Sequence, residues 1–178
     1  MSYLVYDTET TGLNPGYIAQ LSAIKVDGKR VTGFNAWFKV KEMEDGAAKA
    51  NGLSVAICEE LSNGLEFYDR LDDIQELFDG VTDIYGYNTK FDKKFLEAEF
   101  LRCSLQLPNV AWQDVMLTAK QVMQVKKGFK LVNAIEFFNI EDLVIPFAMK
   151  VFGEVEEAHD ARYDTAATMM LARKLNML

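Results

Sequence analysis

The sequence predicts an α/β fold in which helices flank a mixed five-stranded sheet whose first three strands are antiparallel. Three strand-like runs open the chain, and Asp27-Gly28 between the second and the third is a strong hairpin signal. Short strand-like runs then alternate with segments of helical periodicity. This order is typical of a sheet covered by helices, and no linker or repeat divides the chain. We therefore expect a single domain over residues 1–178.

The strands are expected where short runs are rich in apolar and β-forming residues. The first run, residues 3–6, is apolar and ends at Asp7, which indicates a buried strand. The other expected strands are residues 17–26, 31–40, 81–87 and 110–113.

The helices are expected where apolar residues recur at helical spacing. Residues 65–78 show this spacing, and Gly80 ends the segment. Ser54 is expected to cap one helix, and Thr89 another that runs to residue 102. Further helices are predicted over residues 115–124, 131–138 and 161–175, whereas residues 140–156 receive no assignment.

The composition excludes several classes of protein. A formal net charge of −8 excludes a generic basic coat for nucleic acid, because phosphate binding needs clustered Lys and Arg. It is compatible with an acidic metal site, where a bound divalent cation inverts the local charge. Asp7 comes too early for a signal peptide, and no apolar run approaches the roughly 20 residues that cross a bilayer. Cys58 and Cys103 lack zinc-type spacing and indicate reduced thiols. We expect a soluble, cytoplasmic protein without membrane contact.

Two acidic residues at the end of the first predicted strand are the first candidate for chemistry. Asp7 and Glu9 are two residues apart, so their side chains point to the same face of the strand. Two carboxylates at a buried strand end are costly without a cation, and oxygen ligands suit Mg²⁺ or Mn²⁺. Alone, this short motif is more often a pair of solvated acids.

Two further segments carry acids at favourable places. Asp92 lies in the first turn of a helix that follows a predicted strand, near the strand end where α/β sheets place their sites. Alone, it is explained by the helix dipole. His159, the single histidine, stands five residues before Asp164 at the start of the last predicted helix. An imidazole with an unperturbed pKa of about 6.5 suits a base that activates water.

Together these segments resemble the DEDDh 3′-to-5′ exonucleases, the DnaQ-like group that includes the proofreading subunit of bacterial replicative DNA polymerase. Residues 4–13, 87–92 and 159–164 resemble the first, second and third motifs of this family, in the same order. A tyrosine-based sister group has its Tyr four residues before the last Asp, where this chain has Asp160. The histidine version is therefore the match.

The resemblance implies a ribonuclease H-like fold and a two-metal mechanism. Four carboxylates would hold two divalent ions, Mg²⁺ or Mn²⁺: Asp7, Glu9, Asp92 and Asp164. His159 would act as general base, and the product would be a nucleoside 5′-monophosphate.

The same resemblance implies substrate contacts. Thr10, Leu13, Asn51 and Leu53 would meet the terminal nucleotide, and Asn88 and Phe91 the next one. Residues 51–54 resemble the family's His-Gly-Ile-Thr stretch, with Asn51 in place of the usual His. Ordinary core packing is an equally good explanation for Leu13, Leu53 and Phe91.

Several functional alternatives stay open at this stage. Residues 7–12 favour a DNA-directed, proofreading-like exonuclease that acts on single-stranded or frayed 3′ ends, with a polymerase or another replication protein as a partner. An RNA-trimming or oligoribonucleotide-degrading relative has the same five residues. A catalytically silent, protein-binding domain of the same fold is a remote alternative, because all five positions are filled. Leu178 directly follows the last predicted helix, so we expect a domain that acts alone or docks through its own surface.

One basic segment interrupts the acidic chain. Residues 120–130 contain Lys120, Lys126, Lys127 and Lys130 and no acid, and Lys90, Lys93 and Lys94 add to them. They would guide the phosphates of an incoming strand, or they form an ordinary solvated surface, which is the commoner case.

Overall fold

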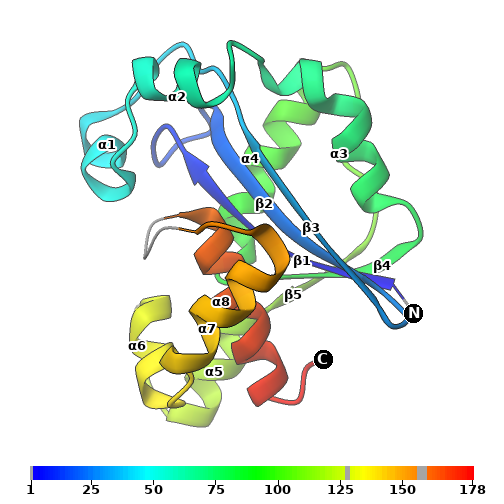
Figure 1. Ribbon diagram of the computed structural model, residues 1–178, viewed down its shortest axis with the longest axis vertical. Coiled ribbons are helices and arrows are strands. Elements are labelled where there is room, and N and C mark those ends of the chain that lie inside the picture. The colour runs from blue at the N-terminus through cyan, green and yellow to red at the C-terminus, as the bar shows by residue number, and fades with distance from the viewer. Residues whose placement is uncertain (1, 127–128, 156–159) are drawn as a thin grey trace.

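A five-stranded mixed sheet forms the centre of the protein. The computed structural model describes residues 2–126, 129–155 and 160–178. The strands lie in the order β3-β2-β1-β4-β5 (Figure 1). They are β1 Ser2–Thr10, β2 Ile18–Asp27, β3 Arg30–Trp37, β4 Val81–Gly86 and β5 Ala111–Asp114. The pairs β1–β2 and β2–β3 are antiparallel, and β1–β4 and β4–β5 are parallel, which confirms the predicted sheet.

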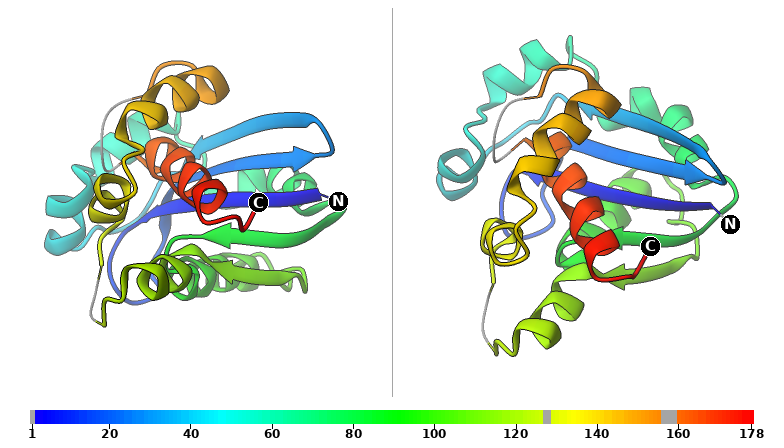
Figure 2. Two further views of the ribbon diagram at one scale, coloured as in Figure 1. Left: turned by 90° about the horizontal axis from the view of Figure 1, so that it is seen from below. Right: turned by 60° about the horizontal axis from the view of Figure 1, so that its bottom comes forward.

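Helices cover both faces of this sheet. They are α1 Asp45–Asn51, α2 Val55–Leu61, the 3-10 helix η1 Phe67–Arg70, α3 Leu71–Phe78, α4 Thr89–Arg102, α5 Val115–Met123, α6 Leu131–Phe137, α7 Glu141–Phe152 and α8 Ala161–Lys174. In Figure 2, α8 lies across one face together with α7, and α3 and α4 lie on the other. Among the described residues, no helix is long and apolar enough to span a membrane.

The alternation of side chains along β1 decides which helix each residue meets. Leu4 and Tyr6 belong to the buried cluster formed with α3 and α4, whereas Val5 packs in a cluster with Met169 of α8. Because successive strand residues point to opposite faces, Asp7 and Glu9 share the α8 face with Val5. Thr8 points to the α4 face.

The element boundaries differ from the predictions in a few places. The first strand continues from the apolar run through the acidic motif to Thr10, and the segment predicted as one helix over residues 65–78 is divided into η1 and α3. The unassigned residues 140–156 contain α7, with Pro146 inside it. The short α1 was not predicted.

The predicted helix caps had different outcomes. Ser54 caps α2 as predicted, since its hydroxyl accepts a hydrogen bond from the backbone N–H of Ile57. Thr89 does not cap α4: the N-cap is Asn88, which has a left-handed backbone (φ 65°) and makes no side-chain capping bond. Both cysteines are free thiols, as predicted.

Candidate metal centre and nucleotide cavity

The carboxyl end of β1 carries the first two candidate ligands. β1 is an inner strand, paired with β2 on one side and β4 on the other. Asp7 and Glu9 are half-buried, and both project from the face that α8 covers. This confirms the side-by-side placement predicted from their spacing.

The first turn of α8 brings a third carboxylate to the same place. Asp164 follows one turn after Asp160, the N-cap of this helix, to whose carbonyl oxygen it donates its backbone N–H at 3.1 Å. Carboxylate oxygens of Asp7, Glu9 and Asp164 all lie within 4.8 Å of one another. Residues more than 150 positions apart in the chain thus form one acidic cluster.

Asp92 approaches the end of β1 from the opposite face. It is buried in the first turn of α4, which starts where the parallel strand β4 has ended. The Thr8 hydroxyl, on the α4 face of β1, donates a hydrogen bond of 2.6 Å to Oδ1 of Asp92. Asp92 is outside the 4.8 Å group, but its charge acts on Asp7 and Glu9. The four acids therefore straddle the end of one strand, three on one face and one on the other.

Burial raises the pKa of all four carboxyl groups. The pKa of Asp7 lies well above its ordinary value because of burial and of the charges of Asp92, Asp164 and Glu9. Burial and the charge of Asp164 raise the pKa of Glu9 to about 8. Burial raises the pKa of Asp92 to about 7, although the hydrogen bond from Thr8 acts to lower it. Burial and the charge of Asp160 raise the pKa of Asp164 to about 7.

This electrostatic conflict matches the chemistry of a divalent cation site. Among the described residues, none of the five ion pairs includes any of these four carboxylates. Like charges gathered in a partly desolvated place are stabilised by a cation, and carboxylate oxygens are the ligands that Mg²⁺ and Mn²⁺ prefer. The residues present therefore fit divalent metal.

The structure does not describe the predicted general base. His159 lies outside the described residues, whose next member is Asp160 at the N-cap of α8. Asp160 is buried and remains acidic: burial acts to raise its pKa, but the hydrogen bonds and charge of Arg162, with a hydrogen bond from Gln20, lower it.

A cavity of about 320 Å³ opens beside Glu9. Four of the predicted substrate residues line it: Thr10, Leu13, Asn51 and Phe91. Leu13 is 74% exposed, so this large apolar side chain is available to a ligand. The volume is in the range of small-molecule sites, and Glu9 is the member of the acidic cluster that lines it.

Asn51 connects the last turn of α1 to the end of β1. Its Nδ2 donates to the carbonyl oxygen of Thr10 at 3.2 Å, and its Oδ1 accepts from the backbone N–H of Leu53 at 3.0 Å. The side chain that replaces the family's usual histidine thus shapes the cavity wall through backbone contacts.

Two predicted substrate residues lie elsewhere. Leu53 is 7% exposed and packs with Ala19, Val40 and Cys58 in a small core cluster. Asn88 is exposed outside the cavity lining, and its backbone N–H donates to Oδ1 of Asp114 at 3.2 Å.

The lysines of the two basic segments differ in their surroundings. Lys126 and Lys130 are exposed, and Lys127 lies outside the described residues. Lys93 lies over the Trp112 ring at 5.3 Å, and Lys94 over the Phe91 ring at 4.8 Å.

Lys94 also reaches the cavity rim, because its Nζ donates to the carbonyl oxygen of Leu13. This contact joins α4 to the loop that presents the Leu13 side chain.

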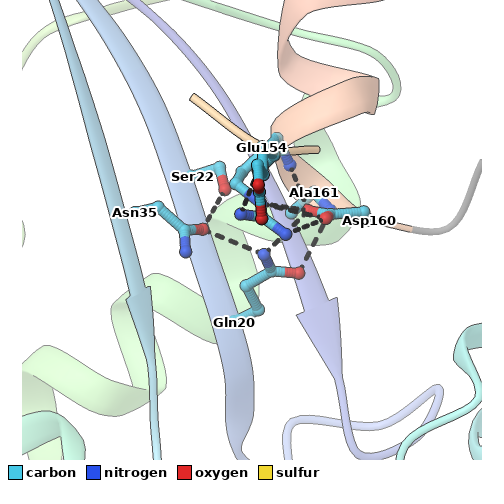
Figure 3. A network of polar contacts seen from close by, with 7 residues as sticks. Gln20, Ser22, Asn35, Glu154, Asp160 and Ala161 are labelled. Carbon is cyan, nitrogen blue, oxygen red and sulfur yellow. Dashed lines mark hydrogen bonds and ion pairs between the residues drawn. The ribbon is translucent and has the colours of Figure 1, made fainter. Parts of the chain in front are cut away.

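A buried polar network beside the acids was not predicted. It centres on Gln20 and Ser22 of β2, the register partners of Glu9 and Asp7 (Figure 3). Polar residues at inward positions of an apolar strand are the signal that indicates such a network, since buried polar groups need partners.

The fold and the acidic cluster together define a ribonuclease H-like domain with a metal-binding carboxylate centre. The chain belongs to the exonuclease family (RNase T), whose pattern it matches over residues 4–172. This confirms the DnaQ-like resemblance and makes the chain an exonuclease domain, a class that implies divalent metal.

Its relatives include much longer proteins. The PolC-type DNA polymerase III of Mycoplasmopsis pulmonis is 27% identical over 133 residues, which are 72% of this chain and 9% of that protein. The PolC-type DNA polymerase III of Bacillus cereus is 25% identical over an aligned length of 182 residues, which covers 98% of this chain and 11% of that protein. The chain thus spans about a tenth of the length of these relatives.

Solved structures show the same fold. Escherichia coli exonuclease I in complex with a dA16 oligonucleotide superposes with a TM-score of 0.73 at 20% identity, covering 99% of this chain and 41% of that one. Exonuclease I from Methylocaldum szegediense gives a TM-score of 0.74 at 21% identity, covering 99% and 40%.

Proposed function

We propose that this domain removes nucleoside 5′-monophosphates from the 3′ end of DNA, at single-stranded or frayed ends, and that it acts as one unit over residues 1–178. The observation that carries the proposal is the cluster of Asp7, Glu9 and Asp164 within 4.8 Å at the edge of a nucleotide-sized cavity. The preference for DNA is supported by the relatives, which are DNA polymerases, and by the solved structure with a bound deoxyoligonucleotide.

The carboxylates are proposed to hold two divalent ions, Mg²⁺ or Mn²⁺. Asp7, Glu9 and Asp164 offer oxygens from the α8 face, and Asp92 offers its second oxygen, Oδ2, while Oδ1 accepts from Thr8. When bound, such ions supply Lewis-acid stabilisation to the attacking and leaving oxygens of a phosphodiester.

The chain's other residues are proposed to prepare the reactants. His159, as the neutral imidazole, takes a proton from the attacking water. Leu13 and Phe91 both line the cavity, where Leu13 contacts the terminal nucleotide and Phe91 the next one. Asn51 keeps the wall beside Thr10 in place. Leu53 supports this wall of the cavity from the adjacent core cluster. Asn88 contacts the DNA strand outside the cavity.

The test follows labelled ends of single-stranded DNA and RNA with Mg²⁺, with Mn²⁺ or with a chelator. We expect stepwise loss from the 3′ end only with metal, faster on DNA than on RNA. Asp7→Ala should abolish this loss and His159→Ala should slow it strongly. Asp72→Ala, at an exposed acid of α3, is the matched control and should leave the rate unchanged.

The other outcomes separate the alternatives. Activity that survives chelation would contradict the metal mechanism, and internal cleavage would contradict the direction. A faster rate on RNA would favour the oligoribonucleotide-degrading alternative. No activity on either polymer, with metal still bound, would favour a silent binding domain.

A further inference from the structure

Gln20 is completely buried and uses its whole amide group. Its Nε2 donates to Oδ1 of Asn35 and to Oδ1 of Asp160, both at 2.9 Å, and its Oε1 accepts from the backbone N–H of Ala161 at 3.1 Å (Figure 3). Ser22 donates to the same oxygen of Asn35 at 2.5 Å, which holds the Asn35 amide in one orientation. A single side chain thus joins β2, β3 and the start of α8.

The start of α8 is fastened at further points of this network. Arg162 donates from Nε to both oxygens of Asp160, at 3.0 and 2.9 Å, and from Nη1 to the carbonyl oxygen of Glu154 at 2.7 Å. One turn later, the hydroxyl of Thr165 donates to the carbonyl oxygen of Ser22 at 3.3 Å. Asp164 lies between these two contacts, in the first turn of the helix.

Gln20 is also the cross-strand neighbour of the acidic motif. In the antiparallel pair β1–β2 its register partner is Glu9, so both side chains lie on the α8 face. The residue that binds the first residues of α8 therefore stands beside one candidate ligand and near another.

The acidic cluster is stable only if other contacts hold the start of α8 against the sheet. Asp164 on α8 faces Asp7 and Glu9 on β1, and without a cation these carboxylates repel one another and push the helix from the strand. Helix α8 is preceded by Asp160 as well, whose charge acts on all three. Contacts that hold the first turn of α8 against β2 oppose this repulsion.

We propose that Gln20 is a positioning residue for the metal centre, which places Asp164 against Asp7 and Glu9 through its bonds to Asp160 and Ala161. This proposal rests on the proposed function, because it concerns the same centre. Gln20 contacts neither metal nor substrate; it acts through α8.

The first test measures Mn²⁺ binding by calorimetry in Gln20→Met, which keeps the size of the side chain and removes its hydrogen bonds. We expect the dissociation constant to rise about 10- to 100-fold, as for other residues that orient metal ligands. The kcat should fall, whereas KM for the oligonucleotide should stay unchanged because the cavity does not include Gln20.

Thr168→Val is the matched control. Thr168 is buried on α8, the helix that carries Asp164, and its hydroxyl has no hydrogen-bond partner among the described residues. This change should leave Mn²⁺ affinity and kcat as they are. A Gln20→Met protein that is only less stable would show a lower Tm with unchanged Mn²⁺ affinity below the transition, and that result would overturn the proposal.

A reciprocal exchange guards against a variant that fails to fold. Gln20→Glu places a carboxylate against Asp160 and should weaken Mn²⁺ binding, and Asp160→Asn should do the same. The double variant restores the hydrogen bond between the two positions with donor and acceptor exchanged, because the amide introduced at position 160 donates to the carboxylate introduced at position 20. It should therefore recover most of the Mn²⁺ affinity. Losses that simply add would overturn the proposal, because separate structural effects are additive.

The wild-type protein distinguishes this proposal from the proposed function. If wild type binds Mn²⁺ and Gln20→Met binds it equally well, the positioning role is wrong and the nuclease function stands. If wild type binds no Mn²⁺ at all, the metal centre itself is wrong.

Discussion

At the residue scale, the most consequential feature is a set of carboxylates that destabilise the fold in the absence of a cation. Asp7 illustrates the conflict, because burial and four neighbouring charges raise its pKa well above its ordinary value. A protein keeps such a residue where function needs it, since an amide of the same shape avoids the repulsion.

Asp7→Asn is therefore expected to separate stability from activity. The metal-free Tm should rise, by about 2–4 °C for each kcal/mol of repulsion removed. Exonuclease activity should fall by roughly 10³-fold or more, because the metal centre supplies several kcal/mol to the transition state. Calorimetric melting with and without Mn²⁺, together with the rate on labelled DNA, checks both parts. A lower metal-free Tm would contradict the repulsion.

The raised pKa of Glu9 predicts a pH-dependent difference between wild type and Glu9→Gln. With a folded pKa of about 8 against an ordinary value of 4.5, folded Glu9 binds more protons than unfolded Glu9 between these values. The metal-free wild type therefore loses stability from this group as pH rises from about 4.5 to about 8. The glutamine does not titrate, so its Tm advantage should grow from pH 5 to pH 8 and then level off. A constant difference across this range would refute the shift.

Residue-level prediction succeeded where the cause is local. The side-by-side placement of Asp7 and Glu9 follows from strand geometry alone. The approach of Asp164 joins distant parts of the chain, and it was expected only because the motifs resemble a known family. Gln20 was missed because its partners, Asn35 and the adjacent pair Asp160 and Ala161, are distant from it in the chain, and no local pattern brings them together.

At the element scale, the predicted strands and most helices are present, and the differences have physical causes. Residues 141–152 form α7 in spite of Pro146, which weakens a helix by removing a donor. Val144 and Ala148 of α7 are completely buried, so tertiary packing outweighs this local cost. The seven-residue α1 contains no buried residue, and hence no apolar period from which it could be predicted.

At the start of α4, two substitutions of Asn88 distinguish the effect of its backbone conformation from the effect of its side chain. Asn88 has φ 65°, a conformation that costs most residues about 1–2 kcal/mol and that glycine adopts freely. Asn88→Ala should therefore lower Tm, whereas Asn88→Gly should not. If the Asn88 side chain contacts the DNA strand as proposed, both variants should raise the KM for the oligonucleotide to a similar extent. A raised KM in Asn88→Ala alone would indicate that only the backbone matters.

At the scale of the whole molecule, two separate regions are expected to bind a polyanion: the acidic cluster through its metal, and the basic segment of residues 120–130 through its lysines. A net charge of −8 gives no overall attraction for DNA, so attraction has to be local. Lys126 and Lys130 are exposed after α5, whereas Lys93 lies over the Trp112 ring of β5 and Lys94 over the Phe91 ring of α4. The exposed segment is therefore the better candidate for contact with phosphates upstream of the cleaved end.

Charge reversal in this segment is expected to flatten the salt dependence of DNA binding. Each phosphate contact of a single strand contributes about 0.7 to the slope of log K against log salt, so Lys126→Glu with Lys127→Glu should reduce the slope by roughly 1.4. Fluorescence anisotropy with a phosphorothioate-protected oligonucleotide measures it.

The matched control is Lys29→Glu with Arg30→Glu, which changes the net charge equally at the exposed β2–β3 hairpin. This hairpin lies at the end of the sheet where β1 begins, away from the acidic cluster, because Asp27 pairs with Ser2 and Arg30 with Asp27. If the control flattens the slope as much as the lysine variant, net charge explains the effect. If neither changes it, the basic segment does not touch the strand. Only a change confined to residues 126 and 127 places the DNA path there, because both variants carry the same total charge and differ only in where it lies.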